Sequence, residues 1–74
     1  MDLKIRVLRR EFRLLQRVEP RVSARLLSLI ELAKGRPTVR VSHDAQISER
    51  TLRSWKSAYQ KAGLAGCRAR HGGG

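Results

Sequence analysis

The residues with the clearest chemical potential lie between Ser48 and Lys61, where basic and hydroxyl side chains recur at helical intervals. If the segment is a helix, one side carries long cationic donors with small hydroxyl groups between them, namely Arg50, Arg53, Ser54, Ser57 and Lys61. A guanidinium group is a planar fork that pairs with phosphate oxygens or a guanine edge, and serine lets a backbone come close. The spacing therefore predicts a surface that contacts nucleic acid.

The opposite side of this helix is apolar and needs a core to pack against. It carries four residues at three- and four-residue steps, namely Leu52, Trp55, Tyr59 and Ala62. We expect the rings of Trp55 and Tyr59 to be core groups and not base-stacking platforms. The Tyr59 hydroxyl is expected to reach solvent or a phosphate.

Signals at both ends place this helix over residues 49–62. Ser48 is a typical N-cap, and the Glu49 carboxylate in the first turn suits the positive end of the helix dipole. A second interpretation gives Glu49 a base contact, because a carboxylate accepts a hydrogen bond from the cytosine amino group. Gly63 ends the helix.

The preceding segment predicts a short helix over residues 38–45, with Thr38 as its cap. The alternation in TVRVS also fits a strand, but a lone strand would have no partner in the chain. Val41 and Ala45 are expected to face the core. Ile47, in the turn that follows, is expected to fill the space between the two helices.

A short helix, a tight turn and a longer basic helix make up the helix-turn-helix plan. Many such motifs have Ala where Ser42 stands and Gly where Gln46 stands; Gln46 therefore requires either a left-handed backbone or a different turn geometry. The helix-turn-helix plan adds Thr38 and Arg40 of the short helix to the expected contacts. The predicted DNA-binding set is Thr38, Arg40, Ser48, Glu49, Arg50, Arg53, Ser54, Ser57 and Lys61.

Two further helices are predicted before this pair, over residues 2–18 and 21–34, with Pro20 and Gly35 as breaks. The first helix has an apolar stripe formed by Ile5, Leu8, Phe12 and Leu15. Beside it runs a basic stripe formed by Arg6, Arg10, Arg13 and Arg17. That basic stripe fits a solvated face, a phosphate clamp or a membrane-surface face, and Asp2 is a candidate cap for the helix.

These patterns predict an all-α fold, a small helix-turn-helix bundle of about four helices over residues 1–64. Its tri-helical core spans residues 21–62, with the first helix as an addition. The glycine-rich, basic stretch at residues 65–74 is expected to be a flexible linker or tail.

The charge balance points to a polyanionic partner. Seventeen Lys and Arg stand against six Asp and Glu, a formal net charge of +11, which favours nucleic acid over a membrane surface. A single Cys excludes an internal disulfide, and no apolar run approaches the ~20 residues of a membrane span. Cys67 and His71 alone do not make a metal site, and no catalytic constellation or phosphate-binding loop is present. We expect a cytoplasmic, non-catalytic segment without cofactor, metal or small-molecule ligand.

The stretch ISERTLRSWKSAYQKAGLAG resembles the N-terminal DNA-binding segment of transposases, including those of Mu-like bacteriophages and several insertion-sequence groups. The matching positions are Ile47, Ser48, Thr51, Leu52, Ser54, Trp55, Tyr59 and the GLAG run at 63–66, with Cys67 where Leu is usual. The resemblance covers about residues 26–70. It implies a homeodomain-like module that binds double-stranded transposon-end DNA, with further copies of itself joining on DNA. A separate RNase H-like domain would hold the catalytic carboxylates.

Two other functions fit the sequence. A stand-alone helix-turn-helix transcriptional regulator would need a dimer interface, which the apolar stripe of the first helix could supply. A membrane-surface or partner-binding amphipathic protein would rest on the first helix alone.

Overall fold

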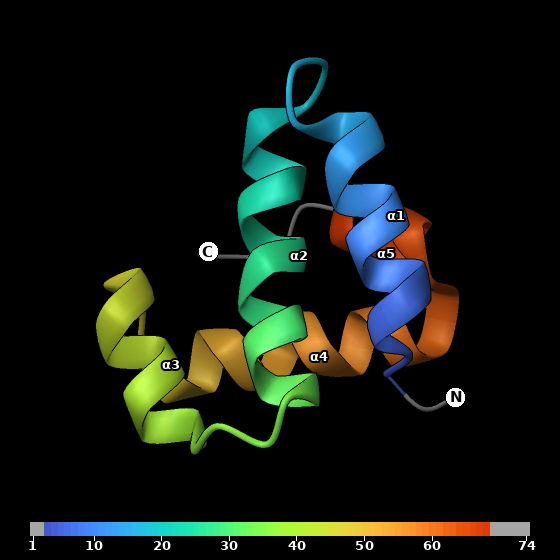
Figure 1. The fold of residues 1–74 in the computed structure, drawn as a ribbon. Helices are drawn as coiled ribbons and strands as arrows, with labels where there is room; N and C mark the ends of the chain where they lie inside the picture. Colours follow the sequence, from blue (N-terminus) through green and yellow to red (C-terminus); the bar gives the residue numbers. More distant parts are fainter. Residues whose placement is uncertain (1–2, 69–74) are drawn as a thin grey trace.

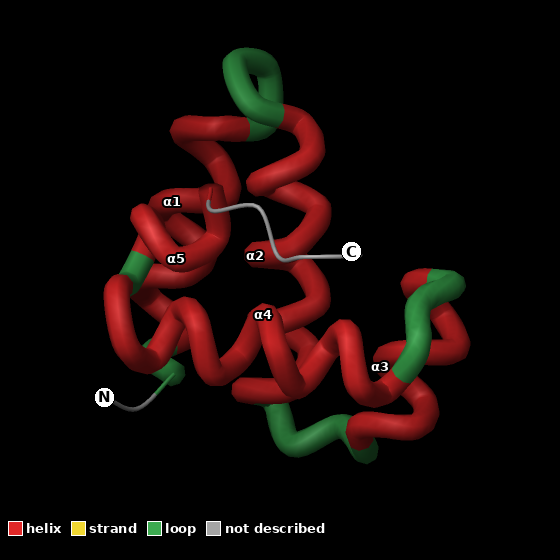
Figure 2. The backbone as a smooth tube through the Cα atoms, turned by 180° about the vertical axis from the view of Figure 1, so that it is seen from behind, coloured by secondary structure: helices red, strands yellow, loops and turns green. Residues whose placement is uncertain are grey.

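The computed structural model describes residues 3–68, and within that range every regular element is a helix (Figure 1). In chain order these are α1 (Ile5–Leu15), α2 (Pro20–Ala33), α3 (Thr38–Ala45), α4 (Glu49–Ala62) and α5 (Leu64–Arg68). The predicted all-α fold is confirmed, with one helix more than the patterns indicated. Seen from behind, α4 crosses the lower part of α2 (Figure 2).

The bounds of α3 and α4 agree with the prediction, whereas α1 is shorter than the predicted 2–18. The α1 helix begins after Lys4, which caps it without a side-chain hydrogen bond, and residues 16–18 form a turn. Glu19, which precedes Pro20, has φ −135° and ψ 74°, because proline excludes helical angles from the residue before it. Asp2, the predicted cap, lies outside the described residues.

The α2 helix is displaced by one residue from the predicted 21–34. Pro20 is its first residue, where the missing N–H costs nothing because the first amides of a helix have no partner. At the other end Lys34 is the cap, and its N–H donates to the Ile30 carbonyl at 3.0 Å. Gly35 follows with φ +93°, a left-handed value that glycine adopts without strain.

The core lies between α1 and α2 and extends to α4 and α5. Its buried members come from all four of these helices and are Leu8, Leu15, Val22, Leu26, Leu29, Ile30, Tyr59 and Cys67. Phe12 and Trp55 are partly buried and pack against this cluster. Ser23, also buried on α2, donates its hydroxyl proton to the Pro20 carbonyl at 2.9 Å, so its polar group is satisfied inside the helix.

The apolar stripe of α1 is used inside the domain. Leu8 is fully buried, Leu15 is nearly so, and Phe12 packs against the same cluster. These side chains are not exposed as the dimer interface that a stand-alone regulator was expected to use. For the same reason they do not form the apolar face that a membrane-lying helix must present to lipid.

The prediction of a flexible tail from residue 65 is wrong for residues 65–68, which belong to α5. Gly63 has φ +61° and lets the chain turn, and Cys67 then enters the core. A Cβ on Gly66 would lie 2.1 Å from the Ala58 carbonyl oxygen, so this glycine is what lets α5 approach α4 closely. Residues 69–74 lie outside the described range, and the tail prediction is untested there.

Candidate nucleic-acid interface

The start of α4 is fixed by the cap that the sequence predicted. Ser48 has an extended backbone, and its Oγ accepts the Thr51 backbone N–H at 3.0 Å. The Ser48 hydroxyl in turn donates to Thr51 Oγ1 at 2.9 Å. Glu49 lies in the first turn, where its negative charge is favourable. A capped first turn holds the N-terminal end of α4 in place, which is the end where recognition helices carry their base contacts.

The inner side of α4 is anchored by three side chains. Leu52 is fully buried, Tyr59 is 4% exposed, and Trp55 is half-buried against the core, so the inward orientation of both rings is confirmed. The Arg25 guanidinium carbon of α2 lies 5.2 Å from the centre of the Trp55 ring, within the range of a cation–π contact. Ala62, predicted on the same side, is exposed, because it is the last residue of the helix.

The prediction that the Tyr59 hydroxyl reaches solvent or a phosphate is wrong. It donates to Glu11 Oε1 of α1 at 2.6 Å and so ties α4 to the N-terminal helix. Burial, and then the hydrogen bond to Glu11, raise the pKa of Tyr59 well above its ordinary value near 10. Tyr59 is therefore a structural residue that joins α4 to α1.

This raised pKa predicts how stability depends on alkaline pH. The protonated phenol is favoured in the folded protein, so its contribution is complete below pH ~10 and decreases as the pH rises toward the folded-state pKa. Absorbance at 295 nm reports this directly, because Tyr59 is the only tyrosine. We expect no tyrosinate signal until the protein unfolds. Ionisation near pH 10 in the folded protein would contradict the Glu11 contact, and a urea-unfolded sample is the control.

The outer side of α4 is open to solvent. All five residues predicted there are exposed, namely Arg50, Arg53, Ser54, Ser57 and Lys61. Arg53 Nη2 lies 3.7 Å from Glu49 Oε1, one turn earlier, and the Arg53 side chain is 70% exposed. An exposed pair of this kind contributes under ~1 kcal/mol, so the guanidinium is free to exchange the carboxylate for a phosphate or guanine edge. Lys56, which the prediction omitted, is also exposed on α4.

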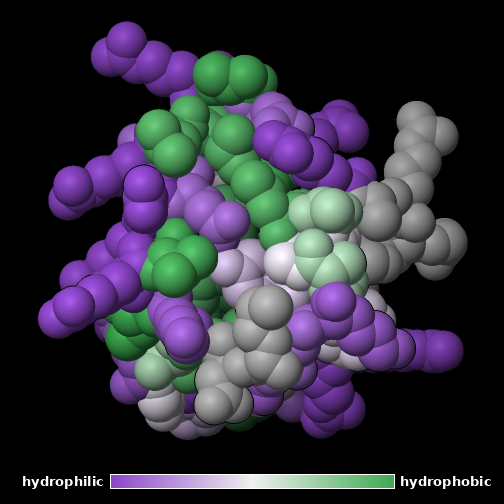
Figure 3. Space-filling model, turned by 90° about the vertical axis from the view of Figure 1, so that its right-hand side faces the viewer, coloured by the Kyte–Doolittle hydropathy of each residue, from purple (hydrophilic) through white to green (hydrophobic). Residues whose placement is uncertain are grey.

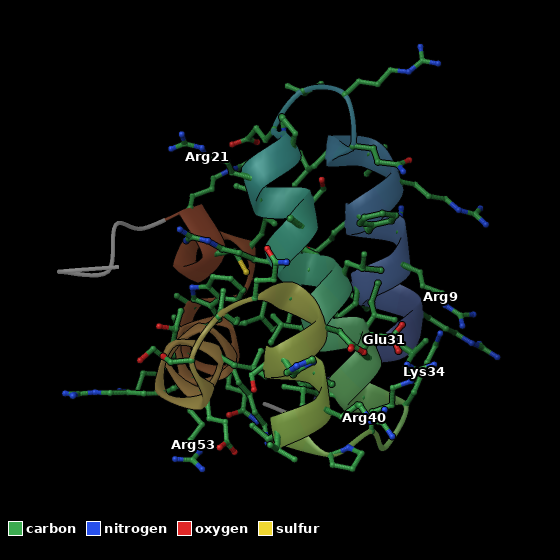
Figure 4. All side chains as sticks on the ribbon, turned by 90° about the vertical axis from the view of Figure 1, so that its left-hand side faces the viewer. Arg9, Arg21, Glu31, Lys34, Arg40 and Arg53 are labelled. Atoms are coloured by element: carbon green, nitrogen blue, oxygen red, sulfur yellow. The ribbon has the colours of Figure 1, made fainter. Side chains whose placement is uncertain are left out.

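Thr38 and Arg40, the two DNA contacts predicted on α3, are placed less favourably for a joint contact than the residues of α4. Thr38 is half-buried. The prediction that it caps α3 is wrong, because Thr38 is the first helical residue and the cap position is held by Pro37, without a side-chain hydrogen bond. Arg40 is exposed, but Figure 4 shows it on the side of the molecule toward Lys34, whereas Arg53 projects on the opposite side. The structure therefore groups the α4 residues on one surface and does not bring Arg40 together with Arg53.

The turn between α3 and α4 adopts one of the two geometries that the sequence allowed. Gln46 is left-handed, with φ 58° and ψ 42°, and is the one residue other than glycine with positive φ in the described range. Its N–H donates to the His43 carbonyl at 3.1 Å, and the Ile47 N–H donates to the Ser42 carbonyl at 3.0 Å. Ile47 is half-buried, as predicted, but Ala45 is exposed because the chain turns away directly after it.

Gln46 yields a prediction about stability. A left-handed backbone costs a residue with a Cβ about 1–2 kcal/mol, and glycine avoids most of this cost. We expect Gln46→Gly to stabilise the domain by about 1 kcal/mol, or roughly 5 °C in Tm, in thermal unfolding. Gln46→Ala is the matched control, because it removes the side chain but keeps the strain, and it should change Tm little. A lower Tm for Gln46→Gly would contradict this turn geometry.

Arg25 is a positioning residue that the sequence did not single out. Besides stacking on Trp55, its Nη1 donates to the Cys67 carbonyl at 2.7 Å, so one side chain of α2 holds both α4 and α5. Its partners are 30 and 42 residues away along the chain, and it is one of many arginines. No local pattern distinguishes it, which is why only the three-dimensional packing reveals its role.

Within residues 3–68 there is no group of three or more His, Cys, Asp or Glu side chains that could hold a metal ion. Burial raises the pKa of the Cys67 thiol to about 11, so this side chain is a protonated core group at neutral pH. His71, with which it had been paired in the sequence, lies outside the described residues. No helix in the described part of the chain has the length and apolar character to cross a membrane.

A short helix, a turn of three residues and a capped helix with its basic side outward define a helix-turn-helix domain. Residues 24–74 match the family model described as Helix-turn-helix domain, and because the match covers more than half of the chain, the protein belongs to this family. No significant match was found among curated proteins or solved structures. The family is a DNA-binding domain that occurs in transposases among other proteins, so the partner of this chain is DNA.

Proposed function

We propose that the chain is the DNA-binding module of a transposase and that it recognises a specific sequence at transposon ends, with α4 in the major groove. The observation that carries this proposal is the division of α4 into two sides. Leu52 and Tyr59 anchor the inner side, and the cationic side of Arg50 and Arg53 faces solvent. A major groove admits one helix, and arginine forks pair there with guanine O6 and N7.

The transposase part of the proposal rests on the segment from Ile47 to Gly66. Its resemblance to transposase DNA-binding segments is supported by the structural roles of the matching residues, since Ser48 caps α4, Leu52 is buried and Gly66 permits the close approach of α5. We further propose that the segment contributes no catalytic residue and acts in the bacterial cytoplasm. Strand cleavage would belong to a separate domain.

Selection from a pool of random duplexes tests this function. We expect one motif to emerge, bound roughly 10³-fold or more tightly than unrelated duplexes at physiological salt. The motif should recur at both ends of the mobile element that encodes the chain. If the selected motif occurred upstream of a gene and not at the ends of a mobile element, the chain would be a transcriptional regulator. If no motif were enriched, sequence-specific recognition would be contradicted.

A further inference from the structure

A second basic surface lies on α1. Four arginines of this helix, which together with Leu14 line a shallow hollow, form what is called here the α1 arginine face: Arg6, Arg9, Arg10 and Arg13. All four are exposed, and within residues 3–68 none of them has a carboxylate at ion-pair distance. The five ion pairs of the described chain use other residues. No carboxylate of residues 3–68 therefore neutralises the charge of this face by an ion pair.

The α1 arginine face and the outer side of α4 point in different directions. In Figure 4, Arg9 projects on one side of the molecule and Arg53 on the other, with α2 and α3 between them. Figure 2 shows α4 toward the viewer, on the side opposite to the front of Figure 1. The domain measures 27 × 27 × 24 Å along its principal axes. A duplex bound along α4 therefore leaves the α1 arginine face directed away from it.

The four arginines are expected to be more stable against a polyphosphate than in water. Successive turns of a helix are ~5.4 Å apart, so four like charges within about two turns repel one another. Duplex DNA presents one negative charge per ~1.7 Å of its axis, and releases bound counterions when arginines replace them. Binding a duplex would thus remove the repulsion on α1 and gain the entropy of the released ions.

We propose that the α1 arginine face binds the phosphate backbone of a second DNA duplex, so that one domain bridges two duplexes. The proposal rests on the proposed function only for the first duplex, which α4 holds. The contact on α1 is to the phosphate backbone, because arginine contacts to phosphate oxygens position a duplex and carry no sequence information.

An anionic membrane is a weaker match for the same face. A helix that lies on a membrane must insert an apolar face, and the apolar stripe of α1 is buried in the core. Exposed apolar surface does appear between the long hydrophilic side chains in Figure 3. On α1, the exposed large apolar residues are Val7 and Leu14. These two residues are flanked by arginines and do not make a continuous stripe.

A bridging assay with the full chain tests the proposal. A duplex with the selected motif is fixed to beads and saturated with protein, and a fluorescent duplex without the motif is then added. We expect the wild type to retain the fluorescent duplex and Arg9→Gln/Arg13→Gln to retain roughly tenfold less, with loading of protein on the first duplex changed less than about twofold. Arg17→Gln/Arg21→Gln, with Arg17 in the turn after α1 and Arg21 in the first turn of α2, removes the same charge outside the hollow and should bridge as the wild type does.

The outcomes separate this proposal from the function assigned to α4. Arg53→Ala should reduce loading on the first duplex, and its failure to do so would count against α4. Unchanged bridging by Arg9→Gln/Arg13→Gln would overturn the second-duplex site. Loss of loading of this variant on the first duplex would also overturn it, because α1 would then be part of the primary interface. Arg9→Lys/Arg13→Lys keeps the charge and should keep bridging. The second-duplex site would also be overturned if DNA-bound wild type captured anionic vesicles and not the fluorescent duplex.

Discussion

Replacing Leu52 with alanine is expected to destabilise the domain by about 3–4 kcal/mol. Leu52 is fully buried on the inner side of α4, and removing a buried leucine loses its transfer free energy and leaves a cavity. A chain of this size has a free energy of unfolding of roughly 4–10 kcal/mol, so about a third or more of the stability would be lost. Urea unfolding followed by the fluorescence of the single tryptophan, Trp55, measures the change.

Leu14→Ala is the matched control, because Leu14 is 69% exposed and its truncation leaves no cavity. We expect that variant to unfold within about 0.5 kcal/mol of the wild type. A small effect at Leu52, comparable to that at Leu14, would show that α4 is not anchored as the structure describes. The outward presentation of its basic side would then lose its physical basis.

Arg53→Ala is expected to weaken binding to the selected duplex by about 1–3 kcal/mol, which is roughly 5- to 150-fold, while binding to unrelated duplexes changes much less. The reason is geometric, since Arg53 is exposed on the outer side of α4 and its exposed ion pair with Glu49 is weak. Fluorescence anisotropy with both kinds of duplex at a fixed salt concentration gives the ratio directly.

Lys56→Ala provides the comparison on the same helix, since Lys56 is exposed but lies outside the predicted contact set. We expect it to change both affinities by a similar, small factor. If Arg53→Ala weakened all duplexes equally and reduced the salt slope by about one, Arg53 would be a phosphate contact and not a base contact. Sequence discrimination would then have to come from another residue of the outer side.

The parts of this fold that could be predicted are those in which the signals are local. The α4 helix has a cap at Ser48, a stop at Gly63 and an apolar stripe between them, and all three lie within one segment of chain. The α3 helix was predicted despite its β-branched residues because a lone strand would have had no partner in the chain. The sequence also limited the turn at Gln46 to two geometries, because a residue with a Cβ at that position has few backbone conformations available.

What could not be predicted depends on contacts between distant segments. The stretch after Gly63 has the composition of a linker, and only the packing of Cys67 and the close approach at Gly66 make a helix of it. The hydrogen bond from Tyr59 to Glu11 and the bridge made by Arg25 join residues at least 30 positions apart. Periodicity within a helix indicates which side is buried, but not which partner it meets.

The central claim is that the outer side of α4 is the surface that enters DNA. Titrating the isotopically labelled protein with the selected duplex and following the backbone amide shifts tests it most directly. We predict the largest shifts between Ser48 and Lys61, with the core amides of α2 nearly unchanged. Largest shifts in α1 or α5, with α4 unaffected, would contradict the account.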